Sequence, residues 1–146
     1  MKIEIDVDEK YRDIELQVRT PALTQDIEKI IALIRMIDMQ IAVKREDETI
    51  LLDASRILFI EAVDRKSFVY TADETFESDL KLYEFEEQLS EKDFIRISKQ
   101  SILNLRKVKS LKADINRKIR VTLKNGEQIV VSRMYSDELR GKLGLK

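Results

Sequence analysis

The chain has 146 residues with 27 basic and 28 acidic side chains, so its formal net charge of −1 gives no indication of its partners. It has no histidine, no cysteine and only three glycines, which excludes the usual zinc and iron–sulfur sites, thiol nucleophiles, Ser-His-Asp triads and glycine-rich phosphate loops. Residues 1–91 hold 12 basic and 23 acidic side chains, whereas residues 92–146 hold 15 basic and 5 acidic, an asymmetry typical of a protein with one surface for a polyanion.

The first 20 residues predict two strands. Segments 2–8 and 14–18 alternate polar and apolar residues, which is the period-two pattern of a strand with one buried face. Residues 10–13 supply the connection between them. Pro21 marks a break after the second segment.

A helix is predicted next, from an N-cap at Thr24 to about Gln40. Its apolar stripe consists of isoleucines at three- and four-residue spacing, namely Ile27, Ile30, Ile31, Ile34 and Ile37. Leu33 and Met36 widen this stripe. The helix therefore has enough apolar surface to be buried on two sides, against the chain's own sheet or against another copy of the chain.

From residue 41 onward the pattern predicts an all-β module with two short helices. The helices span 81–89, where apolar residues recur on one face, and about 134–143. Asn125 and Gly126 are the strongest hairpin signal in the chain. The predicted strands are 41–43, 49–52, 57–62, 67–71, 75–80, 94–97, 102–105, 108–111, 119–123 and 128–131. We therefore expect an α+β, mostly β protein with a strand–helix segment over 1–44 and a β module over 45–146.

An enzymatic function is not indicated. Without histidine or cysteine, general acid–base chemistry falls to Asp, Glu, Lys and Tyr. The acidic clusters at 46–48 and 86–87 lie in turn-like or helix-surface positions, where blocks of charge usually face water. We expect no catalytic site, no metal and no cofactor. No stretch approaches the ~18 apolar residues of a membrane span, and the alternating start is unlike a signal peptide, so we expect a cytoplasmic protein.

The basic residues of the C-terminal half favour nucleic-acid binding over internal charge pairing with the acidic half, because clustered cations gain affinity for phosphates by releasing counterions. Aromatic residues are sparse there, with only Phe94 and Tyr135, so duplex DNA fits better than a single strand stacked on aromatic rings. Three polar segments are candidates for base contacts: 64–67, 98–101 and 132–135. Their structural alternatives are a plain turn, a β-bulge and a helix cap, and the plain turn is favoured for the first.

Four ordered motifs carry a family resemblance. They are Phe-Ile-Glu-Ala at 59–62, Phe-Ile-Arg-Ile-Ser-Lys with Ile-Leu-Asn-Leu over 94–105, Leu-Lys-Asn-Gly-Glu at 123–127 and Val-Ser-Arg-Met-Tyr at 131–135. In these motifs, residues 45–144 resemble the LytTR-type DNA-binding domain of bacterial transcription regulators. The N-terminal segment looks like that of stand-alone members, which lack a receiver domain.

The resemblance implies a fold of short antiparallel strands in several small sheets. It also implies that loops, rather than a recognition helix, enter successive major grooves of bent DNA. Arg133 is the best candidate for a base or phosphate contact, and Lys99 with Gln100 occupies the second contact loop. The first contact loop holds Arg65, Lys66 and Ser67. Many members have a basic residue where this chain has Met134, which removes one phosphate contact at most.

Two further family-like residues flank the second loop. Arg96 is expected to be a phosphate contact or a structural pair, and Asn104 to be a strand-end hydrogen-bonding residue. Six motif residues are expected in the core, namely Phe59, Ile60, Phe94, Ile102, Leu123 and Val131.

The sequence thus leads to the hypothesis of a sequence-specific, duplex-DNA-binding transcription regulator. The resemblance implies direct-repeat sites bound by two protomers, and so a homodimer, with the N-terminal segment in dimerisation or partner contact. It also implies a small membrane protein as a possible regulator. The alternative is a protein-interaction module whose basic face docks an acidic partner.

Overall fold

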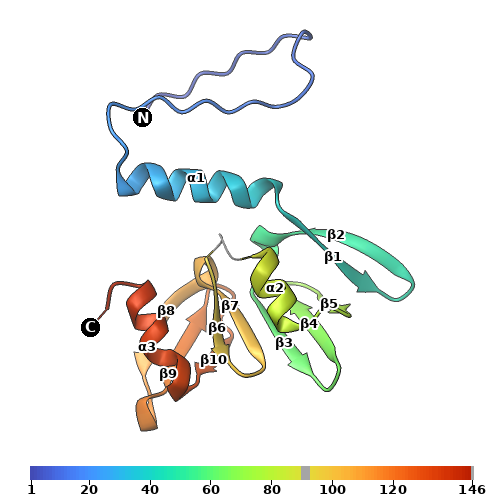
Figure 1. Cartoon of the computed structure of the whole chain (residues 1–146), viewed down its shortest axis with the longest axis vertical. Coiled ribbons are helices and arrows are strands. Elements are labelled where there is room, and N and C mark those ends of the chain that lie inside the picture. Colours follow the sequence, from blue (N-terminus) through green and yellow to red (C-terminus); the bar gives the residue numbers. More distant parts are fainter. Residues whose placement is uncertain (90–92, 146) are drawn as a thin grey trace.

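The computed structural model describes residues 1–89 and 93–145 (Figure 1). They form three α-helices, α1 (Gln25–Asp38), α2 (Leu82–Gln88) and α3 (Arg133–Lys142). They also form ten strands: β1 (Gln40–Arg45), β2 (Glu48–Asp53), β3 (Phe59–Val63), β4 (Lys66–Tyr70), β5 (Thr75–Ser78), β6 (Phe94–Ser98), β7 (Ser101–Asn104), β8 (Val108–Ala113), β9 (Ile119–Leu123) and β10 (Gln128–Val131). Short 3₁₀ turns are η1 (Ala54–Arg56), η2 (Leu105–Lys107) and η3 (Ile115–Arg117). The predicted mostly β fold is confirmed.

The strands form two antiparallel sheets. The larger has seven strands in the order β2-β1-β5-β4-β3-β7-β6, and the smaller has three in the order β10-β9-β8. The predicted Asn-Gly turn joins β9 to β10, where Gly126 has a φ of 94° and its N–H donates to the Leu123 carbonyl over 2.9 Å. A positive φ of this kind favours glycine. The turn prediction is therefore confirmed.

One core cluster lies between α2 and the larger sheet. Leu82, Phe85 and Leu89, the predicted apolar face of this helix, are buried against β-strand residues that include Ile41 and Phe76. Their spacing at i, i+3 and i+7 places them on one side of the helix. This confirms the amphipathic helix expected over 81–89.

A second cluster joins the two sheets and α3. Leu103 of the larger sheet packs with Val121 of the smaller sheet and Leu139 of α3, all nearly inaccessible to water. Five of the six predicted core residues are buried, namely Phe59, Ile60, Ile102, Leu123 and Val131. The sixth, Phe94, is partly buried against the first cluster. The two clusters hold the ends of both sheets in fixed relation, which positions the loops described below.

Asn104 is a buried side chain at the end of β7. Its amide N–H donates to the Ile57 carbonyl over 2.8 Å, and its amide oxygen accepts from the Arg106 N–H over 3.0 Å. The two hydrogen bonds pair one backbone carbonyl and one backbone N–H close to the point where β7 ends and η2 begins. The expectation of a strand-end hydrogen-bonding residue is confirmed.

The prediction of two N-terminal strands is wrong. Residues 1–24 form no strand and lie as two extended segments joined by a turn, away from both sheets (Figure 1). Their apolar side chains are exposed, because no other part of the described chain covers them. A strand needs a partner for its backbone, and the pattern of residues alone does not supply one.

Helix α1 begins where expected. The Thr24 hydroxyl accepts from the Ile27 N–H over 3.4 Å, and the Thr24 carbonyl accepts from the Glu28 N–H over 3.1 Å, as at a helix N-cap. The helix contacts η1 and β2, yet none of its side chains from Gln25 to Ile34 is buried. The side chains of 35–38, which include the predicted stripe members Met36 and Ile37, lie outside the described set. None of the helices in the described ranges is long and apolar enough to cross a membrane.

Candidate nucleic-acid interface

The β6–β7 connection is a tight turn with Lys99 and Gln100 at its tip. Ser98 pairs with Ser101 across the hairpin, and the strand register shifts between Arg96 and Ser98. The Gln100 N–H donates to the Ser98 hydroxyl over 3.1 Å. Both tip side chains are exposed. The segment thus combines the expected register irregularity with a hairpin turn that projects Lys99.

The Arg96 side chain holds this turn by hydrogen bonds to its backbone carbonyls. Its Nε donates to the Ser98 carbonyl over 2.9 Å and its Nη2 to the Lys99 carbonyl over 2.6 Å. The same guanidinium forms an ion pair with Glu86 of α2. Of the two roles expected for Arg96, these contacts are those of a structural pair. Its planar group makes several fixed bonds at once, which a lysine would not reproduce.

The β3–β4 connection is the plain turn favoured by the sequence. Asp64 and Arg65 link Val63 to its cross-strand partner Lys66, and Asp64 has a φ of 56°. Arg65 is exposed, and Lys66 Nζ lies 3.5 Å from the Glu77 carboxylate. Asp is one of the residues that tolerate this left-handed conformation in a turn.

The β3–β4 and β6–β7 turns lie at the same end of the larger sheet. The Ala62 N–H donates to the Gln100 carbonyl over 2.7 Å, and Glu61 pairs with Ser101. Two of the three predicted contact loops are therefore neighbours.

Ser67 does not belong to this surface, which corrects its assignment as a contact residue. Its side chain is buried and its hydroxyl donates to the Leu80 carbonyl over 2.7 Å. Alternation along β4 places Ser67 on the same buried face as Val69. A side chain committed to the sheet in this way is not available to a ligand.

The third predicted segment lies beside the second. The Ser132 N–H donates to the Ile97 carbonyl over 2.9 Å, which fixes the start of α3 against β6. Ser132 has the extended backbone of an N-cap, and Arg133 and Met134 follow it as exposed side chains. Leu139 anchors the far part of the helix in the core. Only the first turn of α3 therefore faces the β6–β7 turn.

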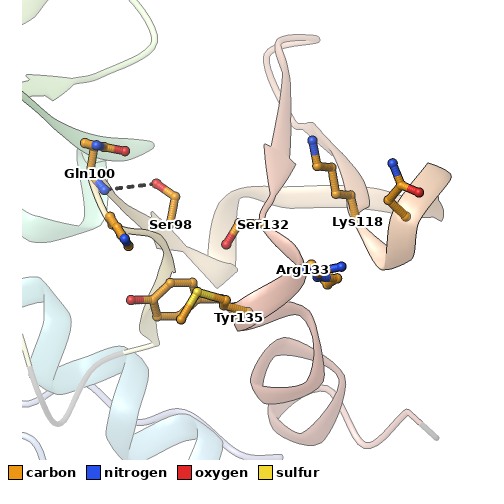
Figure 2. Close-up of a pocket in the computed structure, with 9 residues that line it drawn as sticks. Ser98, Gln100, Lys118, Ser132, Arg133 and Tyr135 are labelled. Carbon is orange, nitrogen blue, oxygen red and sulfur yellow. Dashed lines mark hydrogen bonds between the residues drawn. The ribbon is translucent and has the colours of Figure 1, made fainter.

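A hollow of about 460 Å³ separates these two segments (Figure 2). In Figure 2, Ser98 and Gln100 lie on one side, Lys118 and Arg133 on the other, and Ser132 and Tyr135 between them. The residues that line it are Ser98, Lys99, Gln100, Asn116, Lys118, Ser132, Arg133, Met134 and Tyr135. The structure thus brings Lys99 and Arg133 to one exposed concavity and leaves Arg65 in the adjacent turn.

The β8–β9 loop contributes two residues that the sequence analysis did not select, Asn116 and Lys118. Asn116 and Arg117 have φ angles of 56° and 64°, so two successive residues adopt the left-handed conformation. For the arginine this is a strained conformation, costing of order 1 kcal/mol or more. Lys118 was recognised only as part of a basic run, and Asn116 carries no charge. The signal for a defined loop was the pair of turn-forming residues Asp114 and Asn116.

Asp114 holds the base of this loop. Its carboxylate accepts from the Ile115 N–H over 2.8 Å and lies 3.1 Å from Arg120 Nη2. The backbone hydrogen bond from Ile115, followed by the charge of Arg120, holds the pKa of Asp114 below its ordinary value of 3.8. The carboxylate is therefore ionised at neutral pH and is held by the loop backbone and Arg120.

Four cations at this surface have no carboxylate partner among residues 1–89 and 93–145, whereas Lys66 pairs with Glu77 and Arg96 with Glu86. Ion pairs occupy Lys44, Arg45 and Arg56 elsewhere on the molecule. By contrast, Arg65, Lys99, Lys118 and Arg133 take part in none within that range. Internal pairing with the acidic half therefore does not neutralise them. An unpaired cluster of this kind at a helix N-terminus suits phosphate groups.

Comparison with known families identifies the family to which this fold belongs. A family model described as the LytTr DNA-binding domain matches residues 47–144. The chain belongs to the LytTR family. The match starts in the β1–β2 turn, so α1 and the residues before it lie outside it.

A solved structure extends the LytTR comparison to three dimensions. It is the "LytTr DNA-binding domain of putative methyl-accepting/DNA response regulator from Bacillus cereus". It is 29% identical in sequence, with a TM-score of 0.68, over 73% of this chain and 97% of that one. No curated protein matches this chain significantly. The LytTR domain is a DNA-binding domain, so the hollow and its adjoining turns are the candidate interface for duplex DNA.

Proposed function

We propose that this LytTR protein is a sequence-specific transcription regulator that reads the major grooves of duplex DNA with loops. The observation that carries the proposal is that Lys99 and Arg133, which form no ion pair within residues 1–89 and 93–145, line one exposed hollow. Arg and Lys at such positions match the acceptors of guanine and the backbone phosphates. The β3–β4 turn with Arg65 and Lys66 extends the same surface.

A loop-based mode of reading is supported by the residues that line the hollow. Helix α3 contributes only its first turn, Arg133 to Tyr135, and the other lining residues lie in connections or at a strand end. Helix α2 contributes none of the lining residues. Of the exposed side chains, Arg65, Lys99 and Gln100 lie in turns, and Lys66 and Arg133 are the first residues of β4 and α3.

The proposal includes two protomers on direct-repeat sites, a cytoplasmic location and a small membrane protein as a possible regulator. The two protomers and the membrane-protein regulator rest on the resemblance to stand-alone LytTR regulators. The competing function is a module whose basic face docks an acidic protein. Salt weakens both kinds of complex, so salt dependence alone does not distinguish them.

Sequence competition tests the proposal directly. A labelled duplex from upstream of the protein's own coding region is bound, and unlabelled competitors are added while fluorescence anisotropy is followed. We expect excess unrelated duplex to displace it far less than the same duplex does. Equal displacement by any DNA would reject specific regulation, and preferential displacement by an acidic polypeptide would favour the competing function.

A matched pair of arginine variants tests the site. Arg133→Ala should weaken specific binding by roughly 1–3 kcal/mol, the value of one good bidentate contact. Arg140→Ala is the control, because Arg140 lies in the same helix but does not line the hollow. Wild-type affinity in the Arg133 variant would remove this residue from the interface.

A further inference from the structure

The N-terminal arm, defined as residues 1–24, exposes a regular array of apolar side chains. Ile3, Ile5, Val7 and Ile14 have exposed fractions of 79%, 84%, 89% and 87%. Leu16 and Val18 continue the array on the second extended segment. Single exposed apolar side chains are normal, but a contiguous array of them marks an interaction surface.

The arm is already folded back on itself by its turn. The Tyr11 N–H donates to the Asp8 carbonyl over 3.2 Å, and the Lys10 N–H donates to the Asp8 carboxylate over 2.9 Å. The Tyr11 hydroxyl donates to the Asp6 carboxylate over 2.7 Å. The two extended segments therefore run in opposite directions (Figure 1). Along residues 2–7 and 15–19 the described chain supplies no backbone partner, which leaves edges open for strand pairing.

The apolar face of helix α1 is also not fully buried. Its stripe isoleucines from Ile27 to Ile34 are only half-buried, and Leu33 and the preceding Leu23 are exposed. A single amphipathic helix gains little stability until its apolar face is packed. The arm and α1 are also matched in length, because seven residues of strand span about 23 Å and fourteen residues of helix about 21 Å.

We propose that the arm and α1 form a homodimerisation unit with a second copy of the chain. Two arms related by a two-fold axis pair their open edges into one antiparallel sheet, and the apolar face of this sheet covers the two α1 helices. Such a two-layer arrangement is a stable way to bury one face of a sheet. It is self-complementary, as a two-fold interface requires. The inference concerns the free protein and does not rest on DNA binding.

The surface and charge of the arm fit a second copy. The arm exposes seven Ile, Val and Leu side chains, and α1 adds Leu33 as an eighth: Ile3, Ile5, Val7, Ile14, Leu16, Val18, Leu23 and Leu33. At about 60–120 Å² each they offer about 500–950 Å² per chain, comparable with the ~800 Å² per partner of a stable complex. The arm holds four basic and six acidic side chains in mixed order. Mixed charges suit cross-strand pairing between copies better than a polyanion or an acidic membrane.

Two adjacent substitutions test the proposal on the full chain without DNA. Leu16→Asp places a charge on the apolar face, and Gln17→Asp places the same charge one residue further on, on the polar face. Sedimentation equilibrium should give twice the 17.2 kDa chain mass for the wild type and for the Gln17 variant. The Leu16 variant should dissociate at least about tenfold more readily. Because Leu16 is exposed and remote from both core clusters, the β module should stay folded.

Amide hydrogen exchange supplies an independent readout. Residues 2–8 and 14–18 should be protected in the wild type and exchange freely in the Leu16→Asp variant. A monomeric wild type with freely exchanging arm amides would overturn the proposal, as would equal effects of the two substitutions. Binding of the monomeric variant to a single half-site is measured separately. A failure of dimerisation is thereby distinguished from a failure of DNA binding.

Discussion

The N-terminal region up to Met39 and the β module from Gln40 onward follow the same alternation of apolar residues, yet differ in what covers them. In β1, Ile41 and Val43 have exposed fractions of 1% each, because β2, β5 and the first core cluster surround them. In the arm, Ile3 and Ile5 show the same alternation in open solvent. Alternation therefore indicates an apolar face that must be buried. It does not tell whether residues of the same chain or of another chain bury that face.

The sharpest test of this comparison is a pair of large-to-small substitutions. Phe85→Ala should lower the free energy of unfolding by about 3–5 kcal/mol, because it opens a cavity under α2 in the first core cluster. Ile5→Ala should leave it nearly unchanged at concentrations where the chain is monomeric. Urea denaturation measures both. A loss of similar size at Ile5 would mean that the arm packs against its own module in solution.

A smaller loss of stability is expected when the buried Asn104 amide at the end of β7 is removed. Asn104→Ala should lower the free energy of unfolding by about 1–3 kcal/mol, because the Ile57 carbonyl and the Arg106 N–H lose their partners. Asn125→Ala is the control, since Asn125 makes its hydrogen bonds in an exposed turn. Thermal unfolding of both variants measures the difference. Equal stability of the two would show that the Asn104 bonds are replaced by water.

The sequence predicts most of the β module because its signals are local. The i, i+3, i+7 spacing predicted α2, and the Asn-Gly pair predicted the β9–β10 turn. Ser67 was wrongly assigned to a contact loop although the same alternation that buries Val69 also buries Ser67. The arm was wrongly predicted as strands, because strand formation depends on a partner that is not encoded in the segment itself.

The candidate site depends on contacts between distant segments, and these are less predictable. Lys99 and Arg133 were selected through the family resemblance, but their shared hollow requires the Ser132–Ile97 hydrogen bond between β6 and the start of α3. Asn116 was not selected, because its loop is defined by backbone conformation rather than by charge. Arg96 was expected, as a family-like residue, to be a phosphate contact or a structural pair, and only the fold shows its bonds to the β6–β7 turn. Charge patterns thus predict that a basic surface exists and leave its members undetermined.

The β module's exposed cations allow a finer test, because they lie at both ends of the smaller sheet. Lys118 adjoins the hollow through the β8–β9 loop, whereas Lys124 lies in the β9–β10 turn at the opposite end. Lys118→Ala should weaken DNA binding by about tenfold or less and lower the slope of log K against log salt by about 1. Lys124→Ala should change neither. A salt titration of both variants measures this, and equal slopes would move the interface away from the hollow.

The smallest expected effect is a pH dependence at the base of the β8–β9 loop. The Ile115 N–H, and then Arg120, stabilise the Asp114 carboxylate in the folded chain and hold its pKa below 3.8. Between that lowered pKa and 3.8 the unfolded chain therefore binds more protons than the folded one. The contribution of Asp114 to stability is fully present above about pH 3.8 and is lost as the pH falls through the folded pKa.

An NMR titration of the Asp114 carboxyl carbon should give a midpoint below 3.8. The Arg120→Gln variant should raise this midpoint part of the way back toward 3.8. A midpoint at or above 3.8 in the wild type would mean that the loop is open in solution. Asn116 and Lys118 would then lack the fixed positions that the hollow assigns to them.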